Sequence, residues 1–280
     1  MQRRALELLA CPSCRGAFRT GLRCEGCGRE YAAPEGIPEL RLDADPRTEA
    51  VRAFYADAPF PGYPPRDSHA ALRARAGRSE LARLLDGSIA GDARIVELGC
   101  GTGQMSLFLA SADRVVVGAD LSRPSLRLAE AARLRFGIDR ALFVETDLRA
   151  PGLREGTFDV VLANGVLHHT PDPPSSFAAM ARLARPGGTV IVGLYNAVAR
   201  IPHRLRRGGE VRGWFRDNGV EWLRAVPDTL LGTDPPGSAD LFQPAGDDWV
   251  VEDALAQISW AGKLAHEGGL FVAVGRMGKD

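Results

Sequence analysis

The feature that most constrains this chain is a glycine-rich turn that follows an apolar run. The run Ile-Val-Glu-Leu at 95–98 leads into Gly-Cys-Gly-Thr-Gly at 99–103, and a second apolar run at 115–119 ends at Asp120. Glycine is favoured where the backbone takes positive φ or approaches a ligand with no Cβ in the way. The stretch therefore predicts a strand, a tight turn against a ligand, a helix and a second strand.

The second half of the chain alternates between strand-like and helix-like segments. Strands are expected at 94–98, 114–119, 141–145, 158–163, 189–195 and 270–276, and helices at about 103–111, 123–136, 175–184 and 249–260. This alternation predicts an α/β fold with a parallel sheet and helices on both faces. Such sheets bind ligands at the carboxyl ends of their strands. Because Asp120, Asp147 and Asn164 follow successive strands, we expect all three at that edge.

The glycine spacing distinguishes between two kinds of nucleotide ligand. Dinucleotide-binding turns have the pattern GxGxxG, whereas this chain has GxGxG preceded by Glu97. A dinucleotide needs a helix N-terminus free for its pyrophosphate, and an acidic residue beside the turn suits a cationic ligand instead. S-adenosylmethionine, a sulfonium nucleoside, is such a ligand. We expect Asp120 to accept hydrogen bonds from the ribose hydroxyls, and Asp147 from the adenine amine, beside the backbone amide of Leu148.

Four of the five cysteines form two CxxC pairs near the start of the chain, Cys11 with Cys14 and Cys24 with Cys27. Two such pairs at this spacing predict a tetrahedral four-sulfur site for structural Zn²⁺. Disulfides are the alternative, but they belong to oxidising compartments, and neither an export signal nor a membrane-length apolar run is found. We therefore expect a cytoplasmic protein whose small N-terminal module gains on the order of 10 kcal/mol of folding free energy from zinc.

Two parts of the chain resemble known families. The segment from Leu8 to about residue 42 resembles the small zinc-ribbon family that serves as an activating partner of methyltransferases and also occurs fused to them. The motifs at 96–103, 118–122, 158–161, 164–172 and 185–188 resemble the class I S-adenosylmethionine-dependent methyltransferases. Within that class, the run from Asn164 to Pro173 is similar to the small-molecule branch that includes quinone-biosynthesis C-methyltransferases.

The resemblance implies a seven-stranded Rossmann-like sheet with a small N-terminal zinc ribbon. The implied cofactor-binding residues are Glu97, Gly99, Gly101, Gly103, Asp120, Leu121, Asp147, Leu148 and Asn164. The expected organisation is a zinc ribbon over 1–45, a linker and cofactor-covering helical lid over 46–90, and a methyltransferase domain over 91–280 with an insertion at 197–249.

The lid region contains two features. An aromatic and proline-rich stretch from Phe54 to Pro65 fits either a cover over the cofactor or packing on the side of the domain. Apolar residues at helical spacing then predict one helix over 72–85, and its many arginines are interpreted as a solvated face.

Methyl transfer from a sulfonium is an in-line displacement, so positioning provides much of the acceleration and a base is optional. His168 and His169 follow the fourth expected strand. By analogy with the layout of the family, His168 is expected to face the pocket, either as a base or as a cap of the following turn. Residues that select the acceptor are expected in or beside the insertion: Tyr195, Asn196, His203, Trp214, Trp222 and Phe242.

The leading hypothesis is an enzyme that methylates oxygen or carbon on a small-molecule acceptor, such as a secondary metabolite or a quinone-like compound. The 35 basic and 35 acidic residues balance, so bulk charge indicates neither nucleic acid nor an anionic membrane. Two alternatives stay open. An RNA methyltransferase would bind RNA through the ribbon and the arginines within 200–216. A scaffold protein would bind the cofactor without catalysing methyl transfer. A protein partner or a homodimer through the ribbon is also left open.

Overall fold

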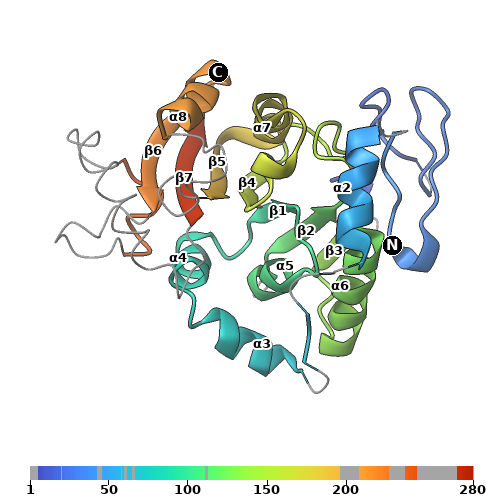
Figure 1. The fold of residues 1–280 in the computed structure, drawn as a ribbon, viewed down its shortest axis with the longest axis horizontal. Helices are drawn as coiled ribbons and strands as arrows, with labels where there is room; N and C mark the ends of the chain where they lie inside the picture. Colours follow the sequence, from blue (N-terminus) through green and yellow to red (C-terminus); the bar gives the residue numbers. More distant parts are fainter. Residues whose placement is uncertain are drawn as a thin grey trace.

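The computed structural model describes residues 6–19, 21–42, 46–57, 59, 62–64, 67–110, 113–195, 208–226, 237–244 and 270–279. Their strands form one sheet in the order β3-β2-β1-β4-β5-β7-β6, seen near edge-on in Figure 1. The strands are β1 (Arg94–Leu98), β2 (Val115–Asp120), β3 (Ala141–Glu145), β4 (Phe158–Asn164), β5 (Ala184–Tyr195), β6 (Val220–Val226) and β7 (Leu270–Met277).

The helices are α2 (Pro46–Asp57), α3 (His69–Ala76), α4 (Glu80–Ser88), α5 (Gln104–Leu109), α6 (Arg123–Phe136), α7 (Pro173–Ala181) and α8 (Gly208–Asp217), with short 3-10 turns η1 (Pro34–Gly36) and η2 (Leu167–His169). Figure 1 shows α4, α5 and α6 on one face of the sheet and α7 and α8 on the other. Within the described ranges, no helix combines the length and the apolar character that crossing a bilayer requires.

The sheet is mixed, which corrects the expectation that it is parallel throughout. Strands β1 to β5 pair in parallel. Strand β7 lies between β5 and β6 and runs antiparallel to both. Antiparallel neighbours need no crossover helix between them, so alternation of elements along the chain does not reveal such a pair. Strand β6 is the one strand of the described sheet that was not expected from the sequence. It and the preceding helix α8 both lie inside 197–249, the segment expected as an insertion.

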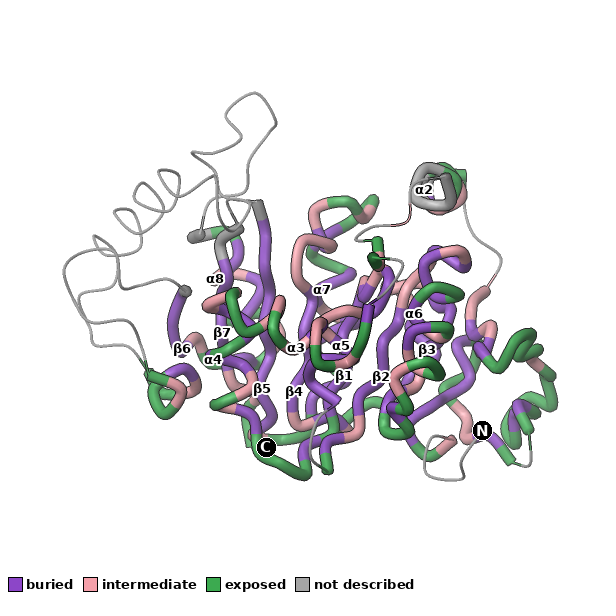
Figure 2. The backbone as a smooth tube through the Cα atoms, turned by 90° about the horizontal axis from the view of Figure 1, so that it is seen from below, coloured by how far each residue is buried: buried purple, intermediate pink, exposed green. Residues whose placement is uncertain are grey.

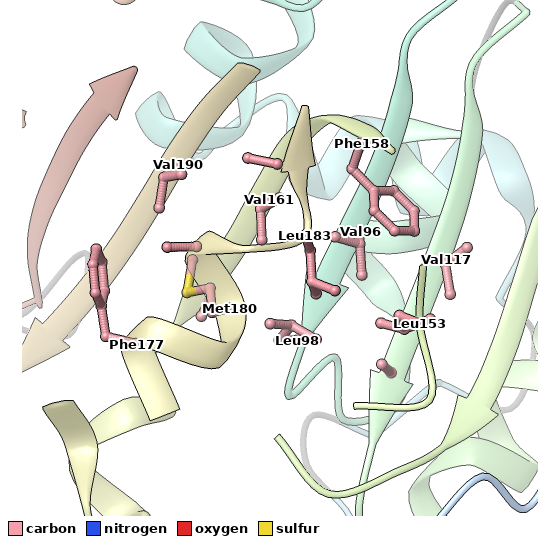
Figure 3. Close-up of a cluster of buried hydrophobic side chains, with 14 of the residues drawn as sticks. Val96, Leu98, Val117, Leu153, Phe158, Val161, Phe177, Met180, Leu183 and Val190 are labelled. Atoms are coloured by element: carbon pink, nitrogen blue, oxygen red, sulfur yellow. The ribbon is translucent and has the colours of Figure 1, made fainter. Parts of the chain in front are cut away.

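Apolar side chains cover both faces of the sheet. Figure 3 shows Phe177 and Met180 of α7 beside Val161 of β4 and Val190 of β5, and all four are completely buried. Fully burying a side chain of this size stabilises the fold by roughly 1.5–3 kcal/mol. On the opposite face, apolar residues of α4, α5 and α6 form a second buried cluster. These two layers hold the strand ends in fixed relative positions.

The helix expected over 72–85 is two helices, α3 and α4. Each has its own N-cap, because the hydroxyl of Ser68 accepts from the N–H of Ala71 and the hydroxyl of Ser79 accepts from the N–H of Ala82. The turn Gly77-Arg78 separates them. Helix α3 can therefore lie at an angle to α4 and approach the glycine turn.

The N-terminal segment is docked on the outer edge of β3, as Figure 1 shows. Leu40 N–H donates to the Glu145 carbonyl at 2.8 Å, and Glu145 N–H donates to the Pro38 carbonyl at 2.9 Å. Leu9 forms an isolated antiparallel bridge with Leu153, in the segment between β3 and β4. Leu9 and Leu40 are fully buried, in the same apolar cluster as side chains of β1, β2 and β4. The N-terminal segment and the sheet therefore share one core.

Candidate cofactor site and zinc centre

A cavity of about 730 Å³ lies at the carboxyl ends of β1 to β4. Ligand pockets typically measure about 300–1,000 Å³, so this cavity has room for a nucleoside. Its wall contains every expected cofactor residue except Gly103: Glu97, Gly99, Gly101, Asp120, Leu121, Asp147, Leu148 and Asn164. Gly103 is instead the N-cap of α5.

The three glycines of the turn have φ values of 69°, 53° and 76°, in the left-handed region. The packing of the protein itself requires two of them to lack a side chain. A Cβ on Gly99 would lie 2.3 Å from Val166 Cγ2, and a Cβ on Gly103 would lie 2.6 Å from Phe143 Cε1. The turn thus needs glycine because of its conformation and its protein neighbours, in addition to any approach to a ligand.

Asp120 ties the end of β2 to the glycine turn. Its Oδ2 accepts from Gly101 N–H at 2.7 Å, and its Oδ1 accepts from Ser122 N–H at 2.7 Å. Burial raises the pKa of Asp120 above its usual range, although these backbone hydrogen bonds pull the pKa down. A carboxylate oxygen has more than one lone pair, so Asp120 retains acceptor capacity toward the cavity.

Glu97 is buried beneath the turn and accepts a short hydrogen bond from the Ser106 hydroxyl. Burial raises the pKa of Glu97 to about 7; the hydrogen bond from Ser106 opposes the rise and the charge of Asp120 adds to it. A nearby positive charge favours the ionised form of a carboxyl group. A cationic ligand in this cavity would therefore be stabilised by Glu97.

The position of Arg75 shows that the arginines of this helical region do not all belong to a solvent-exposed face, contrary to the expectation from the sequence. Arg75 lies in the cavity wall. Its Nη1 and Nη2 donate to the two carboxylate oxygens of Asp67 at 2.8 and 2.6 Å, and the Asp67 side chain is fully buried. This pairing holds the pKa of Asp67 below its usual range. The sequence feature that could have revealed the role of Arg75 is its partner Asp67, which directly precedes Ser68, the N-cap of α3. The helical periodicity does not include Asp67, because this residue lies before the helix.

The turn η2 places the two histidines differently from the expectation. Leu167 is fully buried and fixes the turn. Successive side chains in a 3-10 turn point about 120° apart, so neighbouring residues face different surroundings. His169 lies in the cavity wall, whereas His168 is not among the lining residues. The two rings are in contact, with centroids 4.1 Å apart.

The tryptophans expected to select the acceptor belong to the core beside α8. Trp214 is buried with its ring centroid 6.0 Å from that of Phe177, and Trp222 lies 5.2 Å from Phe215. Neither lines the cavity. Phe242 packs against the apolar cluster beneath α4. The Tyr195 side chain, Asn196 and His203 lie outside the described residues, as do the side chains of Phe54, Tyr55 and Phe60 in the lid and the helix expected at 249–260.

The four N-terminal cysteines converge, with all four Sγ atoms within 4.8 Å of one another. Cys11 Sγ lies 3.8 Å from Cys27 Sγ, and Cys14 Sγ lies 3.4 Å from Cys24 Sγ. Zinc–sulfur bonds of about 2.3 Å in a tetrahedron place the sulfurs about 3.8 Å apart, so this set fits the ion. A Cβ on Gly16 would lie 2.9 Å from Cys24 Sγ, so that glycine leaves room for the sulfurs.

Comparison with known proteins agrees with this geometry. Residues 96–192 match the family model described as a methyltransferase domain. A ubiquinone biosynthesis O-methyltransferase of Ralstonia nicotianae is 43% identical over 98 residues, which are 35% of this chain and 41% of that protein. Matched segments cover 41% to 63% of the curated relatives, so the chain spans about half their length.

Two solved structures share the fold. The geranyl diphosphate C-methyltransferase of Streptomyces coelicolor gives a TM-score of 0.56 at 17% identity, over 84% of this chain and 99% of that one. A chain from the complex of the Haloferax volcanii Trm112 methyltransferase activator with a methyltransferase gives 0.54 at 19% identity, over 85% of this chain and 100% of that one. The matched segment, with the cavity at its strand ends, shows that residues 96–192 of this chain form a methyltransferase domain.

Proposed function

We propose that this protein is an S-adenosylmethionine-dependent methyltransferase that methylates oxygen or carbon on a small molecule of the quinone-like or secondary-metabolite kind. The observation that carries the proposal is that Asp120 and Asp147, from the ends of neighbouring strands, share one cavity with the glycine turn. The name of the relative from Ralstonia nicotianae supports a small aromatic acceptor.

The cavity offers a partner for each polar part of the cofactor. In this proposal Asp120 accepts from the ribose hydroxyls and Asp147 from the adenine amine. The fixed guanidinium of Arg75 pairs with the methionine carboxylate, and Glu97 faces the cationic end. Asn164 contributes to the cavity wall, while its Oδ1 is buried against Gly193 of β5. The bound cofactor supplies the methyl group on its sulfonium.

The acceptor would enter where the cavity wall becomes apolar. Side chains of this part come from α3, α4 and the segment after η2: Leu72, Ala76, Leu81, Ala82 and Pro171. His169, two residues before Pro171, also lines the wall. We assign to His169 the acceptance of a proton from a hydroxyl or carbon acid, because it lines the cavity; a catalytic role for His168 stays a prediction.

We also propose that Cys11, Cys14, Cys24 and Cys27 hold a structural Zn²⁺. Four protein thiolates leave no open coordination position, so the ion would stabilise the ribbon and take no part in the methyl transfer. A cytoplasmic location, where thiols stay reduced, suits such a site. We propose the division into a ribbon at 1–45, a covering segment at 46–90 and a catalytic domain at 91–280. Because Leu9 and Leu40 are buried against the chain's own sheet, a protein partner or a second copy would meet another face of the ribbon.

Calorimetry with S-adenosylmethionine and S-adenosylhomocysteine tests the cofactor assignment. We expect binding that weakens at least about tenfold in Asp120→Asn and in Asp147→Asn, since each loses charge-assisted hydrogen bonds. No heat of binding at millimolar ligand would refute the assignment. For the acceptor, the protein is incubated with labelled cofactor and either a small-molecule extract or total RNA. Label in the small-molecule fraction supports the proposal, and label in RNA alone would contradict it.

A further inference from the structure

Arg149 makes a close contact with the carboxylate at the adenine end of the cavity. Its Nη2 lies 2.8 Å from Asp147 Oδ2, its Nε lies 3.3 Å from both carboxylate oxygens, and its backbone N–H donates to Oδ1 at 2.9 Å. The planar guanidinium thus covers one edge of the carboxylate. Contacts of this kind fix orientation in a way that the point charge of lysine does not.

The same guanidinium also reaches α2. Nη2 of Arg149 donates to the hydroxyl of Thr48, which is buried although α2 stands apart from the sheet layers in Figure 2. Thr48, Asp147 and Arg149 all line the cavity. One turn of α2 is therefore attached to the cavity wall through Arg149. On its other side α2 is linked to the ribbon, where Glu49 pairs with Arg41 at 3.4 Å.

The contact to Asp147 leaves room for a ligand. A carboxylate has about four acceptor positions, and Arg149 uses those on one edge. The remaining positions can accept from an exocyclic amine. Asp147 is 17% exposed and Arg149 is 29% exposed, so the pair is reachable from the cavity and only partly screened by water.

We propose that Arg149 is a positioning residue that sets the orientation of Asp147 toward the 6-amino group of the cofactor's adenine and, through Thr48, fastens α2 over that end of the cavity. The inference rests on the proposed function, since it takes adenine to bind beside Asp147. It adds a specificity determinant for the base and a reason why α2 packs where it does.

A thermodynamic cycle that combines a change in the protein with a change in the ligand tests whether Arg149 orients Asp147 toward the 6-amino group. Affinities are measured by calorimetry for S-adenosylhomocysteine and for S-inosylhomocysteine, which has a carbonyl in place of the amine. Arg149→Met should weaken S-adenosylhomocysteine binding roughly tenfold and S-inosylhomocysteine binding less than about twofold. Arg149→Lys should resemble Arg149→Met, because it keeps the charge and loses the planar contact. The matched control is Arg154→Met, an exposed arginine of the same loop, which should leave both affinities unchanged.

Hydrogen exchange of residues 46–57 tests the second part. S-adenosylhomocysteine should slow exchange of the α2 amides in the wild-type protein and in Thr48→Ser, and should fail to do so in Arg149→Met and Thr48→Val. Thermal unfolding of each variant confirms that it is folded.

Three outcomes would overturn the inference. Equal losses for the two ligands in Arg149→Met would remove any role toward the amine. Tighter binding of S-adenosylhomocysteine by that variant would make Arg149 a competitor of adenine. Unchanged protection of α2 in Arg149→Met would disprove the attachment. By contrast, a wild-type protein that binds neither nucleoside would refute the proposed function itself.

Discussion

Glu97 is a carboxylic acid whose pKa is raised by the fold to near neutral pH. Burial, with a contribution from Asp120, raises its pKa from 4.5 to about 7. The folded state therefore binds the Glu97 proton more tightly than the unfolded state does, and the free energy of unfolding should fall as pH rises from about 4.5 to 7. We expect Glu97→Gln to remove this part of the pH dependence, on the order of 3 kcal/mol above pH 7. Urea unfolding of both proteins between pH 5 and 7.5 measures the difference, and parallel curves would contradict it.

The same carboxyl should couple cofactor binding to protons. Near neutral pH a fraction of Glu97 is protonated, and a cationic ligand favours the ionised form. We expect S-adenosylmethionine binding at pH 6.5 to release protons. The release is measured by calorimetry in two buffers that differ in ionisation enthalpy. Glu97→Gln should show less buffer dependence, whereas an unchanged dependence would point to another group.

Two glycines with similar backbone conformations allow the cost of a left-handed backbone to be measured separately from the cost of steric overlap by a new Cβ. Gly103 and Gly137 have φ of 76° and 66°. A Cβ on Gly137 meets nothing within 4 Å, whereas one on Gly103 would overlap the Phe143 ring at 2.6 Å. Gly137→Ala should therefore cost only the left-handed conformation, about 1–2 kcal/mol. Gly103→Ala should cost clearly more, measured by chemical unfolding. Equal losses would show that Phe143 moves aside without penalty.

At the scale of elements, the ribbon's tail supports the strand end that carries Asp147. The Thr146 hydroxyl donates to the Leu40 carbonyl at 2.6 Å and accepts from Gly152 N–H at 2.9 Å. Thr146 directly precedes Asp147 and also lines the cavity. The N-terminal segment is thus connected to the part of the cavity wall that contains Asp147 by one buried side chain, Thr146.

Loss of zinc should therefore weaken cofactor binding as well as the ribbon. We expect Cys14→Ser, or treatment with a zinc chelator, to lower the metal content, the midpoint of thermal unfolding and the affinity for S-adenosylhomocysteine together. Metal content is read by mass spectrometry and affinity by calorimetry. Ser13→Ala is the control, because Ser13 is an exposed residue between Cys11 and Cys14 that offers no thiolate and does not line the cavity. Full affinity in a metal-free protein would show that the two sites are independent.

At the scale of the whole molecule, local patterns predicted the parallel strands β1 to β5 and most of the residues that line the cavity at their ends. The glycine turn directly follows β1, Asp120 is the last residue of β2, and Asp147 lies two residues after β3. Their positions can therefore be predicted from the direction of each strand alone. The position of β7 in the sheet depends on its pairing with β5 and β6, which are distant in the sequence. The hydrophobic periodicity of a short segment does not predict such long-range pairing. Arg75 was missed, and His168 was favoured over His169, for a related reason: which of several neighbouring side chains faces a cavity depends on elements packed from elsewhere.

The docking of residues 38–40 also determines which edges of the sheet are open. Strand β3 would be an edge strand with unpaired N–H and C=O groups, but the hydrogen bonds to Pro38 and Leu40 occupy those of Glu145 at its end. Exposed edges of this kind pair with other molecules and promote aggregation. We therefore expect the docked N-terminal segment to limit self-association through this edge. Chelation of the ribbon's metal should appear first as light scattering that grows with protein concentration.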